Sequence, residues 1–141
     1  MELRQLDRAA VAMGYMVYQD CMYLPTPEKY AAKMERYLQD SCTLVYGCFV
    51  EDTLRGMLVL QLEGTAGELL GIAVDASCRK QGLGRAMVTT VMTRHGLSKL
   101  AAETDGDAVG FYRNCGFCVQ QFEENFGDCT AVRYRCVLQA K

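Results

Sequence analysis

The chain has 141 residues, a length typical of a single domain that buries its own core. Half of its residues are hydrophobic and only two are proline, which excludes a disordered or low-complexity protein. Its net charge of −2 argues against a partner that is a nucleic acid or a membrane surface. No segment is long and apolar enough to span a bilayer, and no signal-like apolar segment follows Met1, so we expect a cytoplasmic protein.

The first forty residues predict a short edge strand and two helices. Residues 1–6 alternate weakly between apolar and polar side chains. Asp7 is placed to cap a helix over residues 8–19, whose apolar side chains recur at helical spacing. Thr26 and Pro27 start the second helix, because threonine caps a helix well and proline suits its first position.

The rest of the chain predicts a mixed sheet. Short turns separate strand-like runs at 43–50, 53–62 and 68–74, which makes them antiparallel neighbours. A helix follows Gly84 and ends at His95 and Gly96, so the strand expected at 97–104 runs parallel to 68–74. A short helix at 108–114 and a hairpin of 117–122 and 130–138 follow. The order β-α-α-β-β-β-α-β-α-β-β predicts one mixed-sheet α+β domain over residues 1–141.

The loop from Arg79 to Gly84 joins the strand at 68–74 to the helix after it. Free N–H groups at a helix start and the helix dipole attract anions, phosphates above all. Gly82 and Gly84 begin a dinucleotide-binding G-x-G-x-x-G pattern, but Met87 stands at its third glycine, and antiparallel strands precede the loop. A Walker P-loop is excluded because no Gly-Lys-Ser or Gly-Lys-Thr sequence exists. The loop therefore predicts a phosphate-bearing ligand of another kind.

Two motifs in this order resemble the GNAT superfamily of N-acetyltransferases. The signature after the family's fourth strand is glutamine or arginine, two residues, glycine, one residue, then glycine or alanine. The sequence Arg79-Lys80-Gln81-Gly82-Leu83-Gly84 matches it in full. The segment 105–112, followed by Gly116 and Phe117, is a second match, with Asp105 where the family often has asparagine. The resemblance covers essentially the whole chain.

This resemblance implies acetyl-CoA as the cofactor and a primary amine of a small molecule or peptide as the acceptor. It implies that the pyrophosphate binds the amides of residues 79–84 and that the strands at 68–74 and 97–104 splay apart. The pantetheine arm would pair with the exposed edge of the strand at 68–74, as an added strand does. The implied cofactor-binding residues are Ile72, Ala73, Val74, Arg79, Lys80, Gln81, Gly82, Leu83, Gly84, Arg85, Asp105, Phe111 and Tyr112.

Acetyl transfer to an amine needs a neutral amine, a donor for the oxyanion and a proton for the leaving thiolate. Tyr112 is the candidate general acid, because it occupies the family's usual tyrosine position. A phenol, with a pKa of about 10, keeps its proton at neutral pH and can donate it. The alternative is an aromatic side chain that only packs.

Glu68 is the first candidate for the base, since a histone-acetyltransferase-like branch of the family carries its catalytic glutamate near this place. With a strand period of two, Glu68 is expected to share an otherwise apolar face with Leu70, Ile72 and Val74. Glu103, on the next strand, is the second candidate. Proton removal through water, and plain solvated carboxylates at both positions, remain open.

The surroundings of the acceptor are predicted only broadly. The segment 21–26, with Met22, Tyr23 and Leu24, is a candidate wall of the acceptor site. Acidic side chains on the segments that should border this site would draw a cationic amine, or they are ordinary solvated loop charges. These residues are Glu103, Asp105, Asp107, Glu123, Glu124 and Asp128.

The eight cysteines include one C-x-x-C pair, Cys115 and Cys118. No second pair follows and His95 is the only histidine, so we expect no metal and reduced, mostly buried thiols. A redox role for the pair stays open. The alternative function is a non-catalytic acyl-CoA-binding or partner-binding module on the same fold, and the last hairpin could pair across a homodimer.

Overall fold

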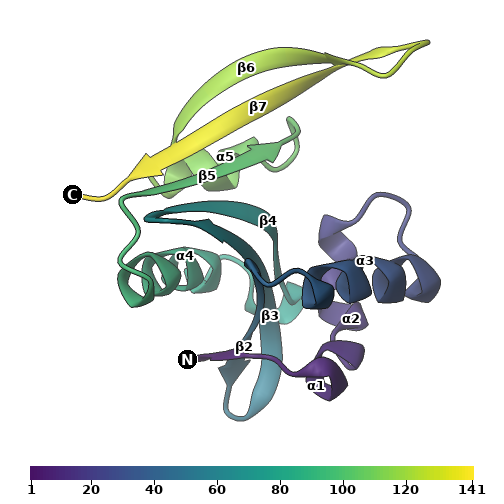
Figure 1. Cartoon of the computed structure of the whole chain (residues 1–141), viewed down its shortest axis with the longest axis vertical. Helices are drawn as coiled ribbons and strands as arrows, with labels where there is room; N and C mark the ends of the chain where they lie inside the picture. Colours follow the sequence, from purple (N-terminus) through teal and green to yellow (C-terminus); the bar gives the residue numbers. More distant parts are fainter.

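The computed structural model describes residues 1–141 and contains one seven-stranded mixed sheet (Figure 1). The strands lie in the order β1-β2-β3-β4-β5-β7-β6. They are β1 (Glu2–Gln5), β2 (Thr43–Val50), β3 (Thr53–Glu63), β4 (Ala66–Val74), β5 (Lys99–Thr104), β6 (Cys118–Asn125) and β7 (Thr130–Gln139). The helices are α1 (Arg8–Ala12), α2 (Tyr15–Tyr18), η1 (Gln19–Cys21), α3 (Pro27–Gln39), η2 (Ala76–Cys78), α4 (Leu83–Arg94) and α5 (Val109–Asn114). The mixed-sheet α+β prediction is confirmed.

The single helix predicted over residues 8–19 is wrong, because the chain breaks at Gly14 into α1 and α2. The backbone of Gly14 packs tightly against the sheet and α3. A Cβ at this position would lie 2.5 Å from Met57 Sδ and 2.7 Å from Tyr30 Oη. Glycine permits this approach and weakens the helix at the same point. The start of α3 is as predicted, with Thr26 Oγ1 accepting a hydrogen bond from the N–H of Lys29 at 3.1 Å.

Helices cover both faces of the β2–β4 part of the sheet (Figure 1). On one face, α4 and α5 pack over a cluster that includes Leu58, Leu60 and Met87. On the other face, α1, α2 and α3 pack over a second cluster that includes Tyr18, Met57 and Val59. The two clusters hold β4 from both sides and leave its far edge to the site described below.

A β-bulge in β4 reverses its alternation between the two faces. Val59 pairs with Gly71 and Leu60 pairs with Leu69, so Leu70 is the extra residue. Leu69 and Ile72 pack in the α4 cluster, whereas Leu70 packs in the opposite one. The prediction that Glu68 shares a face with Ile72 and Val74 is therefore wrong. Glu68 lies on the face of Leu70, opposite to both.

The strands β4 and β5 pair only at one end. Their parallel register covers Ala66 with Lys99 to Glu68 with Ala101, and beyond this point β5 pairs only with β7. Figure 1 shows the two strands diverging from that end. The expected splay is thus present, and it exposes the β5-facing edge of β4 from Leu69 onward.

The final hairpin is longer than expected. Residues 123–125 were predicted as loop, but Glu123, Glu124 and Asn125 pair with residues of β7. The pairing continues because each residue finds a cross-strand partner and the turn needs only residues 126–129. Similarly, α4 begins at Leu83, one residue before Gly84.

None of the helices has the length and apolar character that a bilayer span requires.

Candidate active site

The gap between β4 and β5 opens into a cleft of about 1120 Å³. One wall is β4 from Leu69 to Val74, and the floor is the loop that leads into α4. The opposite wall comes from the end of β5 and from α5, and the segment from Asp20 to Tyr23 forms a rim. The cleft therefore brings together the loop from Arg79 to Gly84, the exposed edge of β4 and Tyr112.

The loop before α4 presents unused hydrogen-bond donors. None of the backbone N–H groups from Lys80 to Arg85 donates a hydrogen bond within the protein. The first N–H of α4 that does so is that of Ala86, which bonds the carbonyl of Gly82. Gly82 has φ +79°, a conformation that glycine adopts without strain, and a Cβ there would meet nothing within 4 Å. Free amides at a helix start, with Lys80 and Arg85 beside them, suit a pyrophosphate. The loop fits the phosphate part of acetyl-CoA.

The packing of Gly84 explains the second glycine of the loop. A Cβ at Gly84 would lie 2.6 Å from Cε1 of Phe111, so the start of α4 touches α5 directly. The guanidinium of Arg85 strengthens the same contact by donating to the carbonyl of Asn114 at 3.3 Å. The two motifs that carry the family resemblance thus lie against each other.

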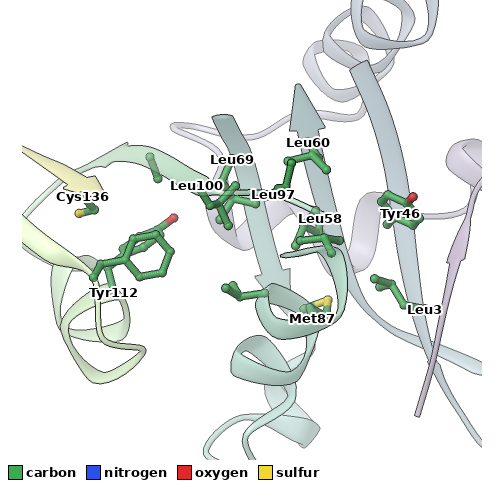
Figure 2. Close-up of a cluster of buried hydrophobic side chains, with 14 of the residues drawn as sticks. Leu3, Tyr46, Leu58, Leu60, Leu69, Met87, Leu97, Leu100, Tyr112 and Cys136 are labelled. Atoms are coloured by element: carbon green, nitrogen blue, oxygen red, sulfur yellow. The ribbon is translucent and has the colours of Figure 1, made fainter. Parts of the chain in front are cut away.

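Tyr112 projects from α5 toward the cleft and is almost fully buried. Its ring makes edge contacts with Phe111 and Phe117, and Figure 2 shows it between Cys136 and Leu100. Its hydroxyl has no hydrogen-bond partner in the protein and is not sealed from the cleft. Burial raises the pKa of Tyr112 well above its ordinary value, so the phenol holds its proton at any physiological pH. The phenol is therefore protonated and available as a donor in the cleft, although the raised pKa makes it a weaker acid than an exposed tyrosine.

Both candidate bases bind the same arginine. Arg135 on β7 donates to both carboxylate oxygens of Glu68, at 2.9 and 3.1 Å, and to Oε2 of Glu103 at 3.2 Å. These carboxylates raise the pKa of Arg135 above its ordinary value, the hydrogen bond to Glu68 most of all. Glu68 therefore has both oxygens engaged, whereas Glu103 keeps Oε1 free. Glu103 lines the cleft and Glu68 does not.

Most of the residues predicted for the cofactor do come together. Those that line the cleft are Ile72, Val74, Arg79, Lys80, Gly82, Leu83, Gly84, Arg85, Asp105, Phe111 and Tyr112. Ala73 does not, because its side chain is buried in the α1–α3 cluster. Gln81 does not either, and its amide donates instead to the carbonyl of Ser77 at 3.5 Å. Asp105 is engaged locally, since Oδ1 accepts the N–H groups of Asp107 and Ala108.

Sequence reasoning missed the ion pairs that link distant elements at the rim. Asp20 of η1 binds Arg79 of the loop, and Arg79 also donates to the carbonyl of Val74 at 3.1 Å. Arg135 was missed as the partner of Glu68, and Arg133 was missed as a cleft residue. No local pattern in the sequence marks such pairs, because their members are far apart in the chain.

The cysteines are all free thiols, and the expectation that most of them are buried is wrong, because only Cys48 and Cys136 are. No group of three or more metal-ligating side chains gathers in the structure. Cys115 is half-buried, and its burial raises its pKa, whereas Cys118 is exposed. Cys21, Cys78 and Cys115 line the cleft. Burial also raises the pKa of Cys21, to about 11, so it is mostly thiol at neutral pH.

A family model described as the acetyltransferase (GNAT) family matches residues 11–117. This match runs from the end of α1 to Phe117 and includes the loop from Arg79 to Gly84 and Tyr112. The chain belongs to the GNAT acetyltransferase family and is an N-acetyltransferase of that family. No curated protein matches the sequence.

Solved structures of the same fold include acetyltransferases that are named for different acceptors. The ribosomal-protein-S18-alanine N-acetyltransferase from Escherichia coli is 19% identical, with 98% of this chain and 92% of that chain covered and a TM-score of 0.73. A variant of the spermidine N-acetyltransferase from Vibrio cholerae is 14% identical, with 99% and 95% covered and a TM-score of 0.74. An aminoglycoside 6′-N-acetyltransferase in complex with coenzyme A is 16% identical, with 99% and 97% covered and a TM-score of 0.74. At these identities the likeness shows the fold.

Proposed function

We propose that this protein transfers the acetyl group of acetyl-CoA to a primary amine of a small molecule or peptide, by direct attack in a ternary complex. The observation that carries the proposal is the row of free amides from Lys80 to Arg85 in the same cleft as the unpaired edge of β4. The amides would hold the pyrophosphate, and the β4 edge would pair with the pantetheine arm. Residues 1–141 would act as one domain.

Two side chains that line the cleft would carry out the proton transfers. Acetyl-CoA supplies the acetyl group as a thioester, and the amine nitrogen forms the new C–N bond as the C–S bond breaks. Glu103 accepts the proton that the amine gives up, through Oε1 or a water. Tyr112 donates a proton to the departing sulfur. Glu68 is the alternative base, and in this arrangement it mainly holds Arg135 in place.

Binding is tested first by thermal unfolding with acetyl-CoA. At 100 times Kd, a ligand that binds only the folded state stabilises it by roughly 2.7 kcal/mol. For a domain of this length, that shift corresponds to a Tm rise of about 8–10 °C. Catalysis is then tested by the release of the CoA thiol with a panel of polyamines, aminoglycosides, amino acids and peptides. Binding without turnover of any amine would instead support the non-catalytic module.

The choice of base is tested by two neutral isosteres. Glu103→Gln removes the carboxylate that lines the cleft and should lower kcat by about 10²- to 10⁴-fold. Glu68→Gln is the matched control, because it changes the other carboxylate bound to Arg135. It should cost less than tenfold. A larger loss in Glu68→Gln than in Glu103→Gln, measured as kcat under saturating acetyl-CoA, would assign the base to Glu68.

The location and assembly of the enzyme are proposals of the same kind. We place it in the cytoplasm, without nucleic-acid or membrane partners, on the charge of the chain. A homodimer could form through β6, because this edge strand leaves one row of its backbone groups unpaired. Sedimentation of the purified protein tests that state directly.

A further inference from the structure

A smaller groove of about 320 Å³ adjoins the active-site cleft. Met22 and Tyr23 line both spaces, so the groove continues the cleft onto the surface of α3. Its remaining lining residues all come from α3 and are Lys29, Ala32, Lys33 and Arg36. Its charged side chains are therefore all cationic.

Nearby carboxylates do not neutralise these cations. Asp20, at the rim, is bound to Arg79, and Glu35 of α3 is bound to Arg8 of α1. Glu28 is the other carboxylate of α3, and it lies on the first turn of the helix without lining the groove. The groove therefore keeps an uncompensated positive charge beside the entrance for the acceptor.

The cations also have defined positions. Lys29 donates from Nζ to the carbonyl of Leu24 at 2.9 Å, and the ammonium of Lys33 lies 5.8 Å from the centroid of the Tyr37 ring. Neither contact removes charge, because a carbonyl and an aromatic ring carry none. Arg36 is exposed and makes no ion pair. These cations are thus available to an anionic ligand.

The length of the cationic row indicates the size of that ligand. A helix rises 1.5 Å per residue, so Lys29 and Arg36 lie about 10 Å apart along α3. An extended peptide advances about 3.3 Å per residue, so three residues cover the row. A single carboxylate reaches only one or two of the cations. Tyr23, which is 88% exposed at the junction with the cleft, offers a surface on which a peptide can pack.

We infer that this groove binds the acidic segment of a peptide acceptor whose amino group enters the cleft. The inference rests on the proposed N-acetyltransferase function and names its substrate class. A polyamine would meet repulsion at the same groove. Of the six carboxylates expected to attract a cationic amine, only two lie in ion pairs: Glu103 with Arg135, and Glu124 at 3.6 Å from Arg133.

The test compares matched peptides by thiol release. Three hexapeptides with a free amino terminus carry glutamate, glutamine or arginine at positions two to five, so that the amino terminus is the one primary amine in each. One exposed ion pair changes affinity by roughly two- to fivefold, so kcat/KM for the glutamate peptide should exceed that for the glutamine peptide by about 10- to 100-fold. The preference should shrink in 0.5 M salt, because salt screens exposed charges.

A charge-reversed variant, Lys33→Glu with Arg36→Glu, should abolish the preference. The control, Lys99→Glu with Lys141→Glu, changes the net charge equally at exposed positions outside both grooves and should keep it. Binding is read independently from the fluorescence anisotropy of a labelled glutamate peptide in the presence of CoA. This second measurement holds even for a variant that turns over slowly.

The outcomes separate this inference from the proposed function. Equal or faster acetylation of the glutamine or arginine peptide overturns the inference and leaves the proposed N-acetyltransferase function unaffected. Failure of every amine in the panel refutes the proposed function, and anisotropy then decides on the groove. Binding that the charge reversal abolishes and the control retains supports the groove; absent or unaltered binding overturns it.

Discussion

The substitution Tyr112→Phe removes the hydroxyl that donates a proton to the leaving sulfur in the proposed mechanism. The hydroxyl of Tyr112 has no partner in the protein, so its removal breaks no native hydrogen bond. Unfolding stability should change by less than about 0.5 kcal/mol, a Tm shift below about 2 °C. The loss of a general acid should lower kcat by about 10²- to 10⁴-fold. KM for acetyl-CoA should stay within about threefold, because the ring that lines the cleft is retained.

Tyr46→Phe is the matched control for this experiment. Tyr46 is buried in the same cluster, but it lies outside the cleft and its hydroxyl bonds Nε2 of His95 at 2.7 Å. Its variant should lose about 1 kcal/mol of stability and keep kcat, with a Tm lower by about 3–4 °C. Thermal unfolding and steady-state thiol release on the three proteins decide. An unchanged kcat in Tyr112→Phe, or equal losses of turnover and of acetyl-CoA affinity, would refute the acid role.

Two further substitutions test the rim and the core. Asp20→Asn breaks the ion pair with Arg79 and frees Arg79 for the cofactor. Because this pair is half-exposed, the substitution should tighten CoA binding by no more than about fivefold. Weaker CoA binding, measured by calorimetry, would contradict this expectation. Burial raises the pKa of Tyr30 from 10.0 to about 12, so this group stabilises the fold fully below pH 10 and loses that contribution as the pH rises through about 12. The excess stability of the wild type over Tyr30→Phe, read from denaturant midpoints, should therefore fade over pH 10–12. An excess that stays constant over this range would show that ionisation of Tyr30 is not responsible.

The geometry of the loop that is proposed to hold the cofactor could be predicted from the sequence because its determinants are local. The residues from Arg79 to Gly84 form their own turn, and Gly82 takes the left-handed conformation that glycine permits. The pairing of β2, β3 and β4 also followed, since short turns make successive strands antiparallel neighbours. The position of β7 between β5 and β6 was not predicted, because no short turn joins β5 to β7. Helix and strand ends were less accurate, because packing decides them: Gly14 broke a helix that its amphipathic pattern predicted as continuous.

The face of Glu68 shows where periodicity fails. Alternation over β4 assumes a regular strand, and one extra residue at Leu70 inverts it for everything beyond. Gly71, the residue after Leu70, is of a type that often marks a bulge, but the predicted alternation took no account of it. The bulge sends Glu68 toward Arg135 while Ile72 faces α4. The choice between the two carboxylates therefore needed the structure.

The acceptor half depends on pairs of residues that the fold alone brings together. Glu68 and Arg135 are 67 residues apart, and Asp20 and Arg79 are 59 residues apart. Arg79 belongs to both halves, because it lies in the cofactor loop, donates to Val74 on β4 and binds Asp20 at the acceptor rim. A phosphate that competes for Arg79 would release Asp20 and the segment that leads to Met22 and Tyr23. Cofactor binding would then change the lining of the groove over α3. The affinity of the acidic peptide should therefore depend on whether CoA is bound.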